Sequence, residues 1–358
     1  MAQLVKAMVR RTIYALALLF AFQSAAADAQ SNMTIKGFPP ELPIEIAGNR
    51  WFVFLDGDID PDAPQRFERY VTQNRIPDRS IVYLNSPGGS LAAGIELGRL
   101  LRKYGFSTDV GRKSPLSSKS FDIDEGGCYS ACAYAYLGGQ FRYLRQGSRY
   151  GVHQFKSVRA DEHIEGTAQV ISALAVEYIR SMDVDPDLFT LSAGASPDGM
   201  QEIDKATSER LNVVNNGRTR PVWTIESTDG QLYLKGQRTT EESGINKFIL
   251  YCEKRRAFLL AIFDTLRRDT ELMNMAAHSL LVDGQVYRLS PKSKRILNGL
   301  FNVTYSLSQK EIVALRKGEN VGVAIQASYE APIFLGFEGM SIGSGRPKLV
   351  GMLDQCAR

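Results

Sequence analysis

The sequence predicts a mixed α/β fold in two parts: an α/β domain at residues 49–218 and a smaller β-rich domain at residues 219–358. In the first part, short apolar and β-branched runs alternate with segments of helical spacing, which is typical of parallel strands joined by helices. Near residue 218 this pattern gives way to strand-like runs separated by turn residues. Neither part contains an internal repeat or a low-complexity segment.

Residues 1–29 have the composition of a secretory signal peptide. Basic residues precede an apolar run at residues 13–22, which is too short to span a bilayer, and small residues follow it. Cleavage after Ala27 and cleavage after Ala29 both fit, and an uncleaved membrane anchor is the alternative. We therefore expect an exported protein, periplasmic or secreted, with no stable membrane span after signal cleavage.

The order of expected elements supports the two-part division. Residues 30–48 predict an extended lead, and the polar segment 111–127 predicts a surface loop. The strands expected in the α/β domain are residues 51–55, 81–84, 106–110 and 150–155. The helices expected there are residues 63–73, 91–104, 129–137, 167–182 and 203–211. In the β-rich domain we expect strands at 222–226, 231–235, 247–251, 258–263 and 323–328, and a closing helix at 348–356.

Composition excludes several classes of function. The 43 Lys and Arg residues are nearly balanced by 39 Asp and Glu residues, and no basic run stands out beyond the leader, so we expect no nucleic-acid partner. The three histidines lie far apart, and the close cysteine pair has no matching second pair, so we expect no metal site. The chain has no phosphate-binding glycine loop, and we expect no cofactor.

Four cysteines follow the leader: Cys128, Cys132, Cys252 and Cys356. An even number in an exported chain indicates disulfides, although four cysteines allow three pairings. Proximity in sequence favours a bond between Cys128 and Cys132, which leaves Cys252 to pair with Cys356. A pair of small buried thiols is the alternative for Cys128 and Cys132.

Three short segments have residue types suited to acyl-transfer chemistry. The first is Asn-Ser-Pro-Gly-Gly at residues 85–89, where a buried strand ends and glycines allow the backbone to approach a ligand. Such a loop can direct N–H groups toward a carbonyl, as an oxyanion hole requires. Taken alone, the segment is more typical of an ordinary strand-to-helix turn.

The second segment surrounds Ser130 and the third surrounds His153. Ser130 lies between a glycine pair and a small-residue helix, where a helix dipole favours a developing alkoxide; a simple N-cap serine is the alternative. His153 is the histidine set in a strand-like run, 23 residues after Ser130. His163 lies in a charged stretch and His278 in the other domain, so neither competes well as a general base.

The order of these segments resembles the Clp protease proteolytic subunit, within the ClpP/crotonase superfold. Asn-Ser-Pro-Gly-Gly comes first, then a serine at the start of a small-residue helix, then a strand containing His-Gln. The resemblance covers residues 50–216, and it is closer to exported bacterial Clp-like proteins with a Cys-x-Ser-Ala-Cys segment. It implies a ClpP/crotonase-like fold for the first domain, a peptide or protein substrate, and a homo-oligomer.

The resemblance also implies a role for each matching residue. Ser130 takes the place of the nucleophile and His153 that of the general base, and Asp198, with Asp204 as its competitor, takes that of the acidic member. The oxyanion hole would comprise Gly88, Gly89 and the amide of Ala131. Two departures are the longer interval between the glycine pair and the serine, and the cysteines flanking Ser130, whose disulfide would lock the turn.

The predicted function is therefore that of an exported serine peptidase. A catalytically silent binding or assembly module with the same fold is the main alternative. Acyl-thioester chemistry and a serine–lysine dyad are further alternatives, disfavoured by the exported location and by His153 respectively. No chemistry is predicted for the β-rich domain.

Overall fold

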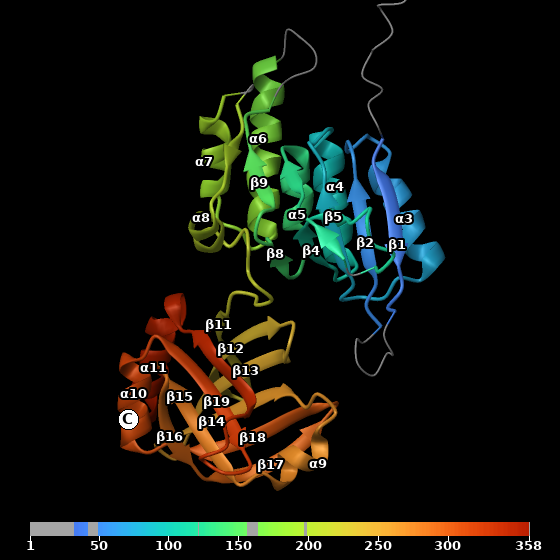
Figure 1. The fold of residues 1–358 in the computed structure, drawn as a ribbon. Coiled ribbons are helices and arrows are strands. Elements are labelled where there is room, and N and C mark those ends of the chain that lie inside the picture. The colour runs from blue at the N-terminus through green and yellow to red at the C-terminus, as the bar shows by residue number, and fades with distance from the viewer. Residues whose placement is uncertain (1–31, 42–48, 121, 156–163, 197–198, 358) are drawn as a thin grey trace, which may run out of the picture.

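The computed structural model describes residues 32–41, 49–120, 122–155, 164–196 and 199–357. The predicted signal peptide lies outside these residues. The chain is a mixed α/β protein whose buried apolar side chains form two separate cores, one ending at Val213 and the other beginning at Trp223. Figure 1 shows the two corresponding lobes, which we call the N-terminal region and the C-terminal region.

The main sheet of the N-terminal region has the strand order β1-β2-β3-β4-β8. Its strands are β1 (Thr34–Phe38), β2 (Phe52–Asp56), β3 (Ile81–Asn85), β4 (Ser107–Val110) and β8 (Arg142–Tyr143). Neighbours from β2 to β8 pair in parallel, and β2 and β3 are apolar at their centres because both faces of the sheet are covered. β1 pairs antiparallel with β2, so the predicted extended lead supplies an edge strand of this sheet.

A second, smaller sheet lies beside the first and has the order β10-β9-β7. Its strands are β7 (Gly127–Tyr129), β9 (Arg149–Val152) and β10 (Gln201–Glu202). The predicted surface loop at 111–127 was wrong in part. Its ends form a two-stranded ribbon of β5 (Arg112–Lys113) and β6 (Ile123–Asp124), and its last residue, Gly127, begins β7.

Helices join these strands near the expected places, except that no helix was expected at residues 187–194. They are α3 (Ala63–Asn74), α4 (Leu91–Lys103), α5 (Ala131–Leu137), α6 (Ile164–Ser181), α7 (Asp187–Gly194) and α8 (Lys205–Arg210). Every residue of α5 is buried, because small side chains let α4 and the strands approach it closely. Ser90 caps α4, and its hydroxyl accepts a hydrogen bond from the Ala93 amide.

The C-terminal region consists of two antiparallel sheets and three α-helices in the part of the chain described. The six-stranded sheet has the order β11-β12-β13-β14-β18-β17 and the four-stranded sheet the order β16-β15-β19-β20. The strands are β11 (Val222–Thr228), β12 (Gln231–Thr240), β13 (Gly244–Glu253), β14 (Arg256–Asp264), β15 (Ala277–Val282), β16 (Gln285–Leu289), β17 (Pro291–Leu297), β18 (Leu300–Ser306), β19 (Asn320–Gln326) and β20 (Leu335–Ser341). The helices are α9 (Asp269–Asn274), α10 (Gln309–Lys317) and α11 (Arg346–Ala357), with a 3₁₀ turn at Gly343–Gly345.

A carboxylate of the C-terminal region connects the two lobes. Glu241, in the turn between β12 and β13, accepts hydrogen bonds from Arg50 Nη1 at 3.2 Å and from Ser107 Oγ at 3.3 Å. The Tyr143 hydroxyl donates a further hydrogen bond to it. All three donors belong to the N-terminal region, and Glu241 is largely buried, so these bonds fix one lobe against the other.

None of the helices in the described residues is both long enough and apolar enough to cross a membrane.

Candidate active site

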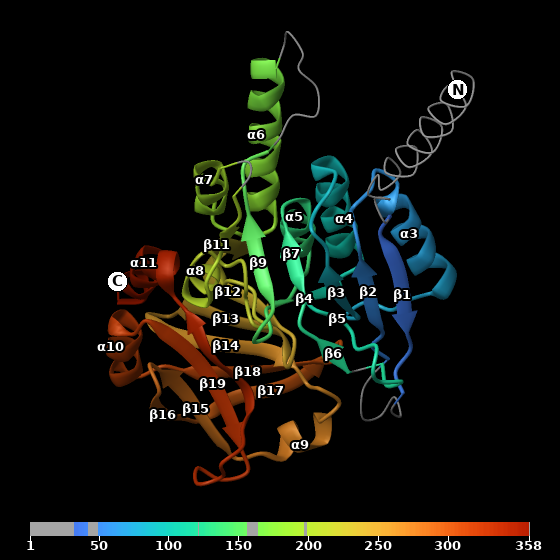
Figure 2. The ribbon, with the colours of Figure 1, turned by 45° about the horizontal axis from the view of Figure 1, so that its top comes forward.

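Ser130 and His153 follow two strands that lie side by side. β7 and β9 pair in parallel, with Tyr129 opposite Gly151, and the two strands are neighbours in Figure 2. Ser130 comes directly after β7 and His153 directly after β9, so both lie at the carboxyl edge of this sheet. The prediction that His153 lies within a strand was wrong, because β9 ends at Val152.

The backbone of Ser130 has a conformation that is rare for a non-glycine residue. Its φ is 57° and its ψ is −122°, at the junction between β7 and α5. The Ser130 amide donates a hydrogen bond to the Gly151 carbonyl at 3.1 Å, which ties the turn to β9. A sharp strand-to-helix turn of this kind presents a serine hydroxyl outward in enzymes that use serine as a nucleophile.

The glycine loop lies directly against this turn. A Cβ atom built on Gly88 would come within 2.7 Å of Ser130 Cβ, and one built on Gly89 within 2.4 Å of the Ile59 carbonyl oxygen. Both glycines have a positive φ, 121° and 128°, so a side chain is disfavoured by backbone conformation as well as by space. The loop therefore brings bare backbone next to Ser130.

The first two residues of the same motif hold this loop in place. Asn85 accepts a hydrogen bond from the Gly127 amide at 3.0 Å and donates one to Asp56 at 3.0 Å. Ser86 Oγ accepts a hydrogen bond from the Gly88 amide at 3.1 Å. Because the Gly88 amide is already engaged, Gly89 is the better placed of the two glycines to offer a free donor.

A cavity of about 550 Å³ opens above these residues. Ser130, His153 and Gly89 all line it, together with apolar and acidic side chains. The other lining residues are Asn32, Asp58, Ile59, Asp60, Pro61, Ser90, Leu91, Tyr134 and Phe155. The cavity therefore places a serine, an imidazole and a glycine loop around one volume large enough for part of a peptide.

Hydrogen bonds hold the end of β9 in place at His153. The His153 carbonyl accepts a hydrogen bond from Ser192 Oγ at 2.7 Å, and Gln154 Nε2 donates one to the Ala193 carbonyl at 2.9 Å, so α7 fixes the strand end. His153 Nδ1 is buried and has no hydrogen-bond partner among the residues that the structure describes. Ser130 Oγ and His153 share no hydrogen bond in this structure.

The two candidates for the acidic member differ in what the structure describes of them. Asp198 lies outside the described residues. The chain re-enters the sheet shortly after it, because Gln201 of β10 pairs with Val152, the residue before His153. Asp204 is the N-cap of α8: it accepts hydrogen bonds from the Thr207 amide and hydroxyl, both at 2.8 Å, and these bonds lower the pKa of its carboxyl. Asp204 is not among the residues that line the cavity.

The two disulfides follow the predicted pairing. Cys128 is bonded to Cys132, and Cys252 to Cys356. The first bond joins β7 to α5 across Ser130, and both of its cysteines are fully buried. Two disulfides in one chain are typical of proteins in oxidising compartments.

His163 and His278 differ from His153 in position. His163 lies outside the described residues. His278 is fully buried in the C-terminal region, where its Nδ1 lies 2.7 Å from the Tyr305 hydroxyl and its Nε2 lies 3.2 Å from the Met275 carbonyl oxygen. Burial lowers the pKa of His278, as expected for a neutral imidazole inside a core.

Sequence reasoning missed the acidic wall of the cavity. Asp58 and Asp60 follow β2, whose carboxyl end lies next to that of β3, and this position at a parallel-strand edge is the signal that predicts them. Arg66 binds Asp60 at 2.6 and 2.7 Å, and these hydrogen bonds lower the pKa of Asp60 to about 2. Tyr134 was also missed as a lining residue; burial raises the pKa of its hydroxyl to about 12.

No protein-family model matches this chain, and a search of curated proteins finds none that matches it.

Proposed function

We propose that this protein is an exported serine hydrolase that acts as a peptidase, with Ser130 as its nucleophile and His153 as its general base. One observation carries the proposal: Ser130, held at φ 57° and ψ −122°, shares a cavity with His153 and with the glycine loop. Strained backbone at a cavity-lining serine is characteristic of nucleophiles rather than of helix caps, whose φ is negative.

In the proposed reaction, Ser130 Oγ attacks the carbonyl carbon of an amide bond while His153 Nε2 accepts its proton. His153 then donates this proton to the departing amine, and a water molecule hydrolyses the acyl-enzyme by the same steps in reverse. The Ser130–His153 hydrogen bond absent from this structure would form with substrate, as catalytic hydrogen bonds in free enzymes often do.

The oxyanion formed during this attack needs donors next to Ser130. We assign the Gly89 and Ala131 amides to this role, because the Gly88 amide is engaged by Ser86 Oγ. Ala131 is the first residue of α5, and its amide therefore has no partner within that helix. One such donor contributes about 2.7–4 kcal/mol to transition-state stabilisation in serine peptidases.

The acidic member of the proposed triad is Asp198. The buried Nδ1 of His153 requires an acceptor, since buried polar groups are rarely left unpaired. Asp198 lies three residues before Gln201, and Gln201 pairs with Val152, the residue before His153. The Asp204 carboxylate, by contrast, caps α8. The Asp198 carboxylate would hold the imidazole tautomer and stabilise its charged form.

The proposal also includes export of the protein and a ClpP/crotonase-like fold for its N-terminal region. The leader at residues 1–29 has the composition of a signal peptide, and the two disulfides favour an oxidising compartment. The resemblance to Clp-type peptidases, together with parallel strands that end at the motif residues, supports a ClpP/crotonase-like N-terminal region. That resemblance also suggests homo-oligomers, which size-exclusion chromatography with light scattering would measure.

The test is covalent labelling of the oxidised protein with a fluorophosphonate probe. We expect wild type to be labelled and Ser130→Ala to show no labelling. His153→Ala should reduce the labelling rate by about 10³-fold or more, whereas His163→Ala, as a matched control, should leave it unchanged. Circular dichroism would verify that each variant is folded.

Two results would reject the proposal in different ways. A folded wild type that resists labelling at every pH and concentration would favour the silent binding module. Equal rates for His153→Ala and His163→Ala would leave a reactive serine but remove the general-base assignment.

A further inference from the structure

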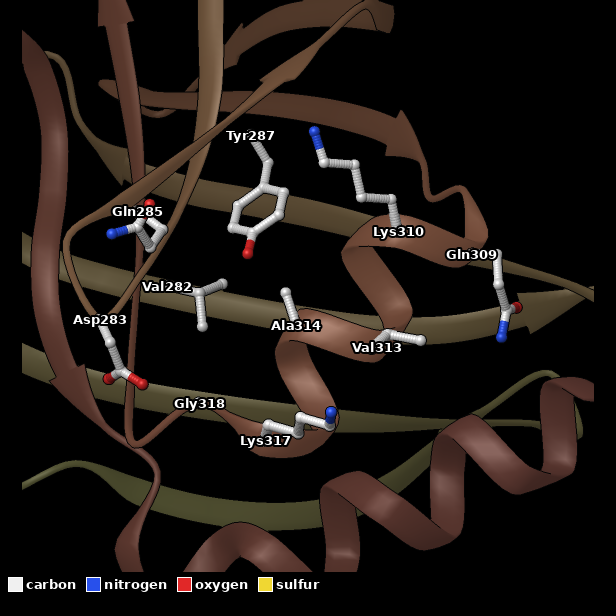
Figure 3. Close-up of a pocket in the computed structure, with 10 residues that line it drawn as sticks. All are labelled: Val282, Asp283, Gln285, Tyr287, Gln309, Lys310, Val313, Ala314, Lys317 and Gly318. Carbon is white, nitrogen blue, oxygen red and sulfur yellow. The ribbon is translucent and has the colours of Figure 1, made fainter.

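The C-terminal region contains a groove of about 520 Å³ that is separate from the cavity at Ser130. Figure 3 shows its two walls, with Lys310, Val313 and Lys317 of α10 on one side and Gln285 and Tyr287 of β16 on the other. The groove is open to solvent, and the side chain of Val313 is 40% exposed within it. An apolar surface of this kind between a helix and a strand is suited to side chains of a bound partner.

The strand that forms one wall is the edge of its sheet. β16 pairs with β15 on one side, and in the described part of the chain no strand pairs with its other side. Alternate residues of a strand face opposite ways, so Gln285 and Tyr287 line the groove while the backbone groups along the free edge point sideways. Such an edge accepts an extended peptide as an additional strand.

The charges around the groove favour an acidic partner. Lys310 and Lys317 are exposed, and neither forms an ion pair with any residue that the structure describes. The Lys310 ammonium lies 5.4 Å from the centre of the Tyr287 ring, so it is held over the groove.

Asp283 is the acidic residue that lines the groove, and its carboxylate is already engaged. It accepts hydrogen bonds from the Glu319 amide at 2.9 Å and from the Asn320 amide at 2.8 Å, and these bonds lower its pKa. The carboxylate thereby fastens the β15–β16 turn to the segment after α10. No ion pair joins Asp283 to Lys310 or Lys317, so both ammonium groups remain available to a ligand.

We propose that this groove binds an extended peptide in which every second residue faces α10 and these residues are acidic and aliphatic in turn, and that the peptide adds to β16 as a fifth strand of the sheet. The peptide backbone pairs with the free edge of β16. Its aliphatic side chains contact Val313 and Tyr287, and its carboxylates lie beside Lys310 and Lys317. The assignment does not depend on hydrolysis at Ser130, so it stands or falls separately from the proposed reaction.

The experiment measures fluorescence anisotropy of a fluorescein-labelled heptapeptide of sequence Ser-Glu-Ser-Val-Ser-Glu-Ser, added to the full chain carrying Ser130→Ala. We expect saturable binding. The same peptide with lysine in place of both glutamates should bind at least about tenfold more weakly, because its charges repel Lys310 and Lys317. The glutamate-containing peptide with alternate backbone amides N-methylated should also bind at least about tenfold more weakly, because it cannot complete the backbone hydrogen bonds with β16.

A matched pair of variants locates the site. Lys310→Glu/Lys317→Glu should weaken binding of the acidic peptide by about tenfold or more, whereas Lys254→Glu/Lys292→Glu, which makes the same charge change outside the groove, should alter it by less than about twofold. Amide hydrogen exchange should show peptide-dependent protection in β16. Absence of binding, equal losses in both variants, or unchanged affinity of the N-methylated peptide would each overturn the proposal.

Discussion

The two regions of this molecule each contain one disulfide, and the two bonds act on very different lengths of chain. Cys128 and Cys132 are separated by 4 residues, and their bond joins β7 to α5 around Ser130. Cys252 and Cys356 are separated by 104 residues, and their bond joins β13 to α11. The chain-entropy effect of a disulfide grows with the length of the loop that it closes.

The two disulfides should therefore have different roles. The long-range bond restricts the unfolded C-terminal region and should contribute mainly to its stability. The short-range bond removes little entropy from the unfolded chain, but it fixes the backbone on both sides of a strained serine. The disulfide of the N-terminal region should therefore maintain the geometry of the site. The disulfide of the C-terminal region should maintain the stability of that region's fold.

The largest expected effect is that of Cys252→Ala/Cys356→Ala on stability. Loss of this bond should lower the free energy of unfolding of the C-terminal region by up to about 4.7 kcal/mol, the value for a loop of about 100 residues. The chain has two tryptophans, Trp51 in the N-terminal region and Trp223 in the C-terminal core, so urea unfolding followed by Trp223 fluorescence in a Trp51→Phe background measures it. Labelling of Ser130 should keep its wild-type rate. A slower rate would contradict the inference that this bond contributes to stability and not to the geometry of the site.

Cys128→Ala/Cys132→Ala should have a smaller effect on stability and a larger one on labelling. The chain-entropy estimate for so short a loop is about 2 kcal/mol. The maximal rate of fluorophosphonate labelling should fall by about tenfold or more, with the apparent affinity for the probe unchanged, because the Ser130 turn loses its brace. The Cys252→Ala/Cys356→Ala variant is the control. Wild-type labelling by folded Cys128→Ala/Cys132→Ala would contradict a positioning role.

The smallest expected effects concern acid, and the two regions should respond over different pH ranges. The pKa of Asp60 is lowered from 3.8 to about 2 by Arg66, so its ion pair stabilises the N-terminal region above pH 4. This contribution, up to about 2 kcal/mol, should be lost as the pH falls from about 4 to about 2. Burial lowers the pKa of His278 from its ordinary value of 6.5, so as the pH falls the unfolded chain takes up this proton before the folded chain does. The C-terminal region should therefore lose stability as the pH falls below about 6.5.

Urea unfolding at a series of pH values, followed separately by Trp51 and Trp223, measures this difference. Asp60→Asn should flatten the Trp51 response between pH 4 and pH 2. His278→Gln, which keeps a hydrogen-bonding side chain without a titrating imidazole, should flatten the Trp223 response below pH 6.5. Parallel responses of the two tryptophans in wild type would show that the regions unfold as one unit.

Much of the secondary structure was predictable from local patterns. The helices expected at 63–73, 91–104 and 348–356 are α3, α4 and α11, and the strands expected at 81–84 and 258–263 are β3 and β14. The helices repeat their apolar residues at helical spacing, and the two strands are short runs of apolar residues. The disulfide pairing was also predicted correctly from proximity in sequence.

β17 is one of the strands that the sequence patterns did not reveal. β17 (Pro291–Leu297) is rich in basic residues and has no apolar period, and it is the edge strand of its sheet because it pairs with β18. Tertiary pairing overrides local preference at such edges. α10 was also missed, although Ser308 and Glu311, which form the capping box at its start, have the spacing typical of a helix N-terminus.

The sequence by itself determined the residue types of the candidate site and their order along the chain: a glycine loop, a serine between glycines and a small-residue helix, and a histidine after an apolar run. Only the tertiary structure decided that β7 and β9 lie in parallel register, which brings Ser130 and His153 to one edge, and that Asp58 and Asp60 line the same cavity. Local interactions set the conformation of a segment of a few residues. Pairing between strands far apart in sequence depends on burial of the whole core, which no short segment encodes.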